Sequence, residues 1–247
     1  YTLSSPQHIE ENLLNREFWA DNVNEKWLTD ITEFVYDEDK KLYLCAILDL
    51  YDNSIVAYNL ATRNDTQLVY DTVEEALSRN PGAQPMIHSD RGFQFTSFGF
   101  KKLVEYYELQ QSMSRAGNCL DNAPMESFWG KLKSEMYYLK DSYSSYKELI
   151  RDIEDYIDFY NNRRLQRKLN AMAPLEYRSI ASWFFWGARP PEKQDTNNSL
   201  DISSVNLTGC SSLAPIHAQV VFVYWSRTCR MRVFIKWNES TAERAAQ

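Results

Sequence analysis

Apolar runs near the start of the chain predict three consecutive β-strands. Residues 27–36 (WLTDITEFVY) alternate apolar and polar positions and are rich in β-branched and aromatic side chains, as strands are. Residues 42–50 (LYLCAILDL) are almost continuously apolar, which is typical of a strand covered on both faces. Asp52 and Asn53 are turn formers ahead of a third strand over residues 54–60, so a three-stranded meander is predicted.

Beyond residue 60 the pattern alternates between helical spacing and short strands. Apolar side chains lie along one side of residues 65–79, and Asn80-Pro81-Gly82 ends this predicted helix. Together with the meander, the pattern predicts an α/β fold with a mixed five-stranded sheet flanked by helices. The other elements expected are helices over 97–107, 125–139 and 146–160, strands over 85–88 and 110–113, and a loop over 114–124.

The pattern also divides the chain into three segments. Residues 1–26 are a polar lead-in, residues 27–182 hold the periodic elements of a core, and residues 183–247 form a C-terminal extension of different composition. The extension contains Pro190-Pro191 and a stretch rich in Ser, Thr and Asn, and then apolar alternation returns up to Trp237. We expect the extension to be either disordered or a short β-hairpin.

Composition excludes several classes of protein. Of the 247 residues, 44% are hydrophobic and 25% charged, as in soluble globular proteins, and no apolar run approaches the roughly 18 residues that cross a membrane. The 4 cysteines and 3 histidines are scattered, so neither a disulfide framework nor a zinc module is expected. Without a signal peptide at the start of the sequence, we expect a cytoplasmic protein. The net charge of the chain is −7 because residues 1–90 are strongly acidic, whereas the remainder is slightly basic.

Three carboxylates stand out by their positions. Asp30 lies inside a predicted strand, where Asp is rare, and Asp90 closes the short strand that ends in His88-Ser89. Glu126 lies in the first turn of a predicted helix, and 35 residues separate it from Asp90. Open α/β sheets bind ligands at the carboxyl ends of their strands, so these acids are candidates for one site.

Four blocks of sequence resemble a known family. WLTDITEF, HSDRGFQFTS, SMSRAGNCLDNAPMESFWGKLKSE and YNNRRLQRKLNAMAPLEYR are similar, in order and spacing, to the integrase core of bacterial insertion-sequence transposases. The closest group is the insertion-sequence three family, whose members are relatives of retroviral integrases. The resemblance covers roughly residues 15–182. It implies a ribonuclease H-like fold, an enzyme that cuts and rejoins DNA, and a catalytic triad of Asp30, Asp90 and Glu126.

The chemistry of strand transfer agrees with such a triad. Charge develops on the attacking and leaving oxygens of an in-line displacement, and two divalent ions stabilise both. Mg²⁺ is a hard ion that prefers oxygen ligands, so carboxylates suit it better than His or Cys. We therefore expect Asp30, Asp90 and Glu126 to bind two ions of Mg²⁺ or Mn²⁺, with water or a DNA 3′-hydroxyl as the nucleophile.

Basic residues are candidates for DNA contacts. Lys133 follows Glu126 by two helical turns and so lies on the same face of its helix. The densest basic cluster in the sequence directly follows the helix predicted over 146–160. Cations at such a place can contact DNA phosphates, or they can equally complement the dipole of the helix. Within the predicted loop, which we expect to be mobile, Asn118 and Asn122 are further candidates, whereas His88 is expected to be a packed neighbour. The cluster consists of Arg163, Arg164, Arg167 and Lys168.

Two departures from the family leave alternatives open. The helix-turn-helix region that precedes such cores is absent, so we expect a missing N-terminal region or a separate helix-turn-helix partner, and the tail has no counterpart. An active protein is expected to form a homo-oligomer on element-end and target DNA, at the nucleoid. The alternatives are a decayed transposase fragment that binds DNA or an intact transposase without catalysis, and a ribonuclease H-like nuclease that only hydrolyses.

Overall fold

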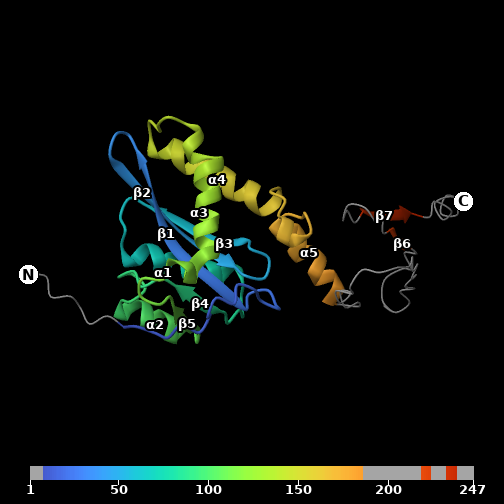
Figure 1. Cartoon of the computed structure of the whole chain (residues 1–247), viewed down its shortest axis with the longest axis horizontal. Coiled ribbons are helices and arrows are strands. Elements are labelled where there is room, and N and C mark those ends of the chain that lie inside the picture. Colours follow the sequence, from blue (N-terminus) through green and yellow to red (C-terminus); the bar gives the residue numbers. More distant parts are fainter. Residues whose placement is uncertain (1–7, 186–217, 224–231, 238–247) are drawn as a thin grey trace, which may run out of the picture. The chain divides into compact units, whose positions relative to one another are not determined.

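A computed structural model describes residues 8–185, 218–223 and 232–237 (Figure 1). The chain divides into two compact units, Tyr1–Gly187 and Ala188–Gln247. None of the helices among the described residues is long and apolar enough to cross a membrane.

The first unit is built on a mixed five-stranded sheet, which confirms the predicted fold class. Its strand order is β3-β2-β1-β4-β5. The first three strands pair antiparallel as a meander, and β4 and β5 add parallel to the β1 side. The central strand β1 therefore has an antiparallel neighbour on one side and a parallel one on the other. The strands are β1 (Lys26–Tyr36), β2 (Lys40–Asp49), β3 (Ile55–Ala61), β4 (Met86–Ser89) and β5 (Gln110–Met113).

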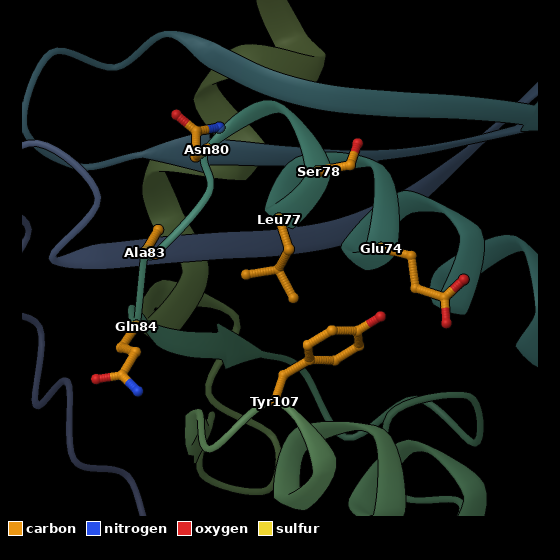
Figure 2. Close-up of a pocket in the computed structure, with 8 residues that line it drawn as sticks. Glu74, Leu77, Ser78, Asn80, Ala83, Gln84 and Tyr107 are labelled. Atoms are coloured by element: carbon orange, nitrogen blue, oxygen red, sulfur yellow. The ribbon is translucent and has the colours of Figure 1, made fainter.

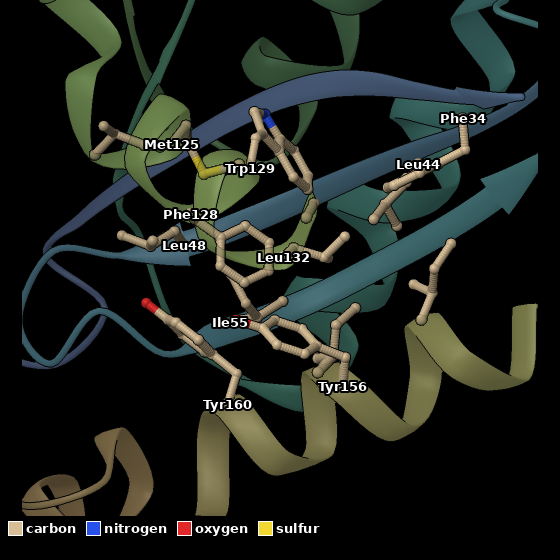
Figure 3. Close-up of a cluster of buried hydrophobic side chains, with 14 of the residues drawn as sticks. Phe34, Leu44, Leu48, Ile55, Met125, Phe128, Trp129, Leu132, Tyr156 and Tyr160 are labelled. Atoms are coloured by element: carbon tan, nitrogen blue, oxygen red, sulfur yellow. The ribbon is translucent and has the colours of Figure 1, made fainter. Parts of the chain in front are cut away.

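Helices pack on both faces of this sheet because the strand side chains alternate between two cores. Leu28 of β1 belongs to a core that includes side chains of α3 and α4, among them Phe128 and Tyr160 (Figure 3). Its neighbour Trp27 belongs to the other core, with α1 and α2. The helices are α1 (Thr66–Arg79), α2 (Phe98–Tyr106), α3 (Ala123–Glu135), α4 (Tyr146–Asn162) and α5 (Pro174–Phe185), with short 3₁₀ turns η1 (Cys119–Asn122), η2 (Tyr137–Leu139) and η3 (Arg167–Leu169).

Two helices differ from the prediction. The helix expected over 125–139 ends at Glu135, since Met136 has φ −134° and ψ −61° and a 3₁₀ turn follows. Helix α5 was not predicted, and it continues to Phe185, past the boundary expected at residue 182. That boundary stays a prediction.

The predicted lead-in is bound to the sheet. The backbone N–H groups of Leu13 and Leu14 donate to Ser112 Oγ of β5, at 2.9 and 3.1 Å. The N–H of Met113 donates to the carbonyl of Glu11 at 3.2 Å. Leu14 is only 1% exposed and belongs to the core cluster shared with α3 and α4. The segment before β1 thus covers the edge strand β5, whose backbone would otherwise lack partners.

The second unit contains two paired strands. β6 (Ala218–Val223) and β7 (Arg232–Trp237) are antiparallel, with Ala218 opposite Trp237. This pairing corresponds to the β-hairpin alternative of the prediction. The other residues of the predicted extension from Trp186 onward lie outside the described residues.

Candidate active site

Parallel pairing of β1 and β4 brings two of the predicted acids side by side. Lys26 lies opposite Met86, and Leu28 lies opposite His88. Two residues further along, the same register sets Asp30 beside Asp90, the first residue after β4. Adjacent strands are about 4.8 Å apart. Both acids therefore lie where β4 ends, as open α/β sheets place their ligands.

Helix α3 brings the third acid to this place. Glu126 lies in the first turn of α3 and is exposed. Trp129 follows it by three residues, so the two side chains project from neighbouring positions on one face of the helix. The indole Nε1 of Trp129 donates to Asp30 Oδ2 at 3.0 Å. This hydrogen bond directs the Glu126 face of α3 toward Asp30. Trp129 itself is 7% exposed.

Electrostatics connect the three carboxylates. The pKa of Asp30 is raised to about 6, first by burial and then by the negative charges of Asp90 and Glu126. Hydrogen bonds from Trp129 and from the backbone N–H of Ile31, which is 2.8 Å from Asp30 Oδ1, act in the opposite direction. No described residue forms an ion pair with any of the three acids. The result is a half-buried carboxylate beside two like charges without a bound cationic side chain.

A glycine makes room for the Asp90 carboxylate. The N–H of Gly92 donates to Asp90 Oδ1 at 2.8 Å. A Cβ atom added at Gly92 would lie 2.9 Å from that same oxygen and 3.0 Å from Gln94 Oε1. Because the 2.9 Å contact is shorter than real Cβ atoms show, a larger residue here would require the end of the Asp90 side chain to shift. The sequence motif HSDRGFQFTS contained Gly92, but the contact that explains it was not apparent from sequence.

His88 is a buried hydrogen-bonded neighbour of the site, as expected. Ser112 Oγ accepts from two backbone N–H groups, so its own hydrogen is donated to His88 Nδ1 at 2.8 Å. Nδ1 is then the acceptor, and Nε2–H donates to Ser114 Oγ at 3.1 Å. Burial lowers the pKa of His88 to about 4, which keeps the ring neutral. Both ring nitrogens are used by protein partners, so His88 has a structural role between β4 and β5.

The loop before α3 is more tightly held than the prediction of a mobile loop implied. Asp121 is fully buried and accepts hydrogen bonds from the backbone and side chain of Arg115 at 2.8–3.0 Å. Asn122, a predicted DNA contact, is 4% exposed, and its Nδ2 lies 3.4 Å from the carbonyl of Thr29. Its location beneath the surface corrects that prediction. Asn118 remains exposed at the loop tip.

The candidate DNA contacts fall into two groups. Arg164 forms a two-point ion pair with Glu135 of α3, through its Nε at 2.8 Å and through Nη2. Arg163 pairs with Asp158 at 3.1 Å. Arg167 and Lys168 are exposed, and no ion pair within the described residues involves them. Lys133 is half-buried, with Nζ 5.4 Å from the centre of the Phe34 ring.

A second group of acids turns out to be structural. Asp52, expected to be a simple turn residue, is fully buried, and its carboxylate accepts from Nε and Nη2 of Arg178 on α5. The same Nη2 donates to Asp49 Oδ2 at 2.8 Å and to Ser54 Oγ at 2.9 Å. Burial raises the pKa of Asp49 to about 6, while Arg178 and two backbone N–H groups oppose the rise. These residues fasten α5 to the turn between β2 and β3.

A surface depression lies away from the acids. It has a volume of about 370 Å³, and Tyr107 faces Leu77 across it (Figure 2). Ala83 and Gln84 on its rim precede β4, whereas Asp90 follows β4. The depression is therefore at the other end of that strand from the candidate site.

The donor chemistry of Asp30, Asp90 and Glu126 fits a hard divalent cation. Their oxygens are the ligands that Mg²⁺ and Mn²⁺ prefer, and the mutual repulsion that raises the Asp30 pKa would be relieved by a cation. Within the described part of the chain, no group of three or more acidic, His or Cys side chains is gathered closely enough to hold one ion. Asp90 and Glu126 are both exposed, so their side chains have room to reorient.

The sheet order, with acids on β1, after β4 and on α3, defines the class of ribonuclease H-like integrase cores. Integrase core domain models match residues 20–119 and residues 126–181. The catalytic core of HTLV-2 integrase, solved in complex with magnesium, superimposes with a TM-score of 0.50 at 17% identity, over 62% of this chain and 95% of that one. At this identity the likeness shows the fold alone.

Sequence relatives define the family. An uncharacterized transposase-like protein of Haemophilus influenzae is 45% identical over 70% of this chain and 79% of its own length. The putative transposase InsK for insertion sequence element IS150 of Escherichia coli is 42% identical over 68% of this chain, which spans 59% of InsK. The chain belongs to the insertion-sequence three family of transposases and carries its integrase core, that of a DDE-type polynucleotidyl transferase.

Proposed function

We propose that this chain cleaves the ends of an insertion element and joins them to target DNA, using Mg²⁺ or Mn²⁺ held by Asp30, Asp90 and Glu126. The observation that carries the proposal is the half-buried Asp30 carboxylate between two like charges, at the end of β4 and without a cationic partner among the described residues. Folding keeps such a repulsive group only at a cost, and sites with this arrangement are commonly functional.

Each residue has a distinct part in this proposal. Asp30 is held in one orientation by Trp129 and the N–H of Ile31, with its remaining lone pairs available for a cation. Asp90 is fixed at one oxygen by the N–H of Gly92, and Glu126 approaches from α3. Two bound divalent ions would stabilise the charge that develops on the attacking and leaving oxygens. No side chain need act as nucleophile, since water or a 3′-hydroxyl attacks the phosphodiester.

DNA and protein partners complete the proposal. Arg167, Lys168 and Lys133 are the basic side chains that we propose for phosphate contacts, because Arg163 and Arg164 are already paired with acids. The chain spans only part of InsK, so recognition of element ends is assigned to a helix-turn-helix region supplied upstream or by a partner. Strand joining at two ends further implies a homo-oligomer.

Conservative variants of the triad test the proposal. Asp90→Asn and Glu126→Gln keep size and remove one charge each, so metal-dependent nicking and strand joining should fall by about 10³-fold or more. Because the three acids act together, the double variant should be little worse than either single one. The assay uses element-end duplex, a target duplex and Mg²⁺ or Mn²⁺, with the helix-turn-helix region supplied in trans.

Matched controls separate the outcomes. Asp155→Asn changes an exposed acid on α4 and should leave nicking and joining at the wild-type level. Normal joining by Glu126→Gln would contradict the triad assignment. Nicking that needs the triad, with no joined product under any condition, would identify a hydrolysis-only nuclease. Metal-independent DNA binding without nicking in the wild type would identify a decayed fragment.

A further inference from the structure

The segment before β1 contacts the loop that precedes α3, the helix of the third acid. Arg16 Nε lies 2.6 Å from Asp121 Oδ1, and Asn12 Nδ2 lies 2.9 Å from Asp121 Oδ2. These contacts span more than 100 residues of sequence, and they join the N-terminal segment to η1, directly ahead of α3.

Asp121 is the most heavily bonded carboxylate of the described residues. Each of its oxygens accepts from Arg115 and from the N-terminal segment, so five hydrogen bonds end on a side chain with no exposed surface. The Arg115 guanidinium first, and Arg16 after it, hold the pKa of Asp121 well below its usual range. These five bonds therefore hold the carboxylate in one position and favour its charged form.

The N-terminal segment is shaped for this contact. Asn15 and Arg16 have φ values of +46° and +63°, a conformation that non-glycine residues adopt only when surrounding contacts stabilise it. The N–H of Asn15 donates to Asn12 Oδ1 at 2.8 Å, which closes the turn and leaves Asn12 Nδ2 for Asp121. Leu14, between them, is buried in the core. The turn therefore holds the side chains of Asn12 and Arg16 where both can donate to Asp121.

Helix α3 depends on this anchor at its start. Asn122 occupies the N-cap position without making a side-chain capping bond. The first turn of α3, with Pro124 and Glu126, is therefore positioned by the preceding η1 turn. Within η1, Asp121 makes five hydrogen bonds to the rest of the core, whereas the Asn122 side chain makes one long contact, to the carbonyl of Thr29 at 3.4 Å. Displacing Asp121 would move the end of α3 from which Glu126 faces Asp30.

We infer that Asn12 and Arg16 are positioning residues for Glu126, acting through Asp121 on the first turn of α3. The N-terminal segment then supports the proposed cation site as well as covering β5. The inference rests on the proposed function, because it assumes that Glu126 ligates the cation.

The test makes two measurements on the 247-residue chain. One is the Mn²⁺ concentration that gives half of the maximal rise in the midpoint of thermal unfolding. The other is the Mn²⁺ concentration that gives half of the maximal rate of nicking of an element-end duplex. Arg16→Ala should raise the half-saturating Mn²⁺ concentration in both measurements by about tenfold, as loss of residues supporting metal ligands does. Arg16→Lys should recover part of this change. Asn12→Ser, a milder change, should move both concentrations in the same direction, and it serves if Arg16→Ala does not fold.

The control is Arg79→Ala on α1, which breaks an exposed ion pair with Glu75 and should leave both Mn²⁺ concentrations unchanged. If Arg16→Ala and Asn12→Ser lower the metal-free unfolding temperature while both Mn²⁺ concentrations stay at the wild-type value, the contacts only stabilise the fold and the inference is wrong. If instead the proposed function is wrong, Mn²⁺ should change the unfolding midpoint and the nicking rate of Glu126→Gln as it changes those of the wild type.

Discussion

Two groups of acids lie beside the first half of β1, the buried pair Asp49 and Asp52 and the more exposed group around Asp30, and they differ in the charge of their neighbours. Asp49 lies opposite Trp27, three residues before Asp30 on that strand. Burial is the first cause of a pKa of about 6 in both Asp30 and Asp49. Yet Asp49 and its neighbour Asp52 are paired with Arg178, whereas Asp30 has Asp90 and Glu126 beside it.

A raised pKa therefore does not by itself mark a functional acid in this protein. Arg178 supplies the positive charge that the Asp49 cluster needs, and the pair stabilises the packing of α5. Asp30 has no ion-pair partner among the described residues, and in the proposed function a bound cation supplies the compensating charge. The contrast predicts opposite consequences for substitutions in the two clusters.

The largest effect on stability is expected at the paired cluster. Arg178→Ala leaves two buried carboxylates without their cation, and breaking a buried ion pair typically costs about 3–5 kcal/mol of unfolding free energy. Asp52→Asn should cost less, because Arg178 keeps Asp49 as its partner. Urea unfolding at neutral pH measures both, and a loss below about 1 kcal/mol would show that the cluster is not a structural pair.

The unpaired acid should behave in the opposite way. Asp30→Asn removes a repelled charge while Trp129 keeps an acceptor, so the metal-free protein should gain roughly 1–3 kcal/mol at pH 7.5. The folded state keeps the Asp30 proton up to about pH 6, whereas the unfolded state loses it near its ordinary pKa. The Asp30 contribution to stability is thus full at low pH and declines as the pH rises to about 6.

Urea unfolding of the wild type and Asp30→Asn between pH 4 and 8 checks the sign. The two stability curves should separate as the pH rises and run parallel above about pH 6.5. Curves that coincide at all pH values would mean that folding does not raise the pKa of Asp30.

A smaller effect is expected at the glycine beside Asp90. The methyl group of Gly92→Ala would displace the Asp90 carboxylate, so the metal-dependent nicking rate should fall roughly tenfold. Gly130→Ala on α3 is the matched control, since a Cβ there meets no atom within 4 Å. An unchanged nicking rate in Gly92→Ala would mean that Asp90 tolerates a shift.

The smallest effects concern the exposed basic residues. Removing one phosphate contact lowers the salt slope of DNA binding by about 1, so Arg167→Ala and Lys168→Ala should each reduce it. Arg163→Ala removes a side chain already paired with Asp158 and should change the slope less. The slopes are measured by fluorescence anisotropy of a labelled duplex at about 50 to 200 mM salt, because DNA affinity changes roughly tenfold or more over this range. Equal slopes for all three variants would show that Arg167 and Lys168 contribute no more to DNA binding than the ion-paired Arg163 does.

Local patterning predicted the strands and most helices because each is encoded by the spacing of its own apolar residues. The role of Asp52 was missed because its partner Arg178 is more than 100 residues away in sequence, as are Asn12 and Arg16, which bind Asp121 together with the nearby Arg115. The contact between Trp129 and Asp30 was not predicted, since it depends on how α3 crosses β1. Helix α5 was missed because its periodic pattern lies where the composition begins to change.

Direct Mn²⁺ binding tests most simply whether Asp30, Asp90 and Glu126 form one cation site. The electron paramagnetic resonance signal of free Mn²⁺ is followed while Mn²⁺ is titrated with the 247-residue chain at pH 7.5. The wild type should remove Mn²⁺ from solution, and Asp30→Asn, Asp90→Asn and Glu126→Gln should each weaken binding by at least about tenfold, with Asp155→Asn unchanged. Mn²⁺ affinity equal to that of the wild type in all three triad variants would contradict the claim that these acids form one cation site.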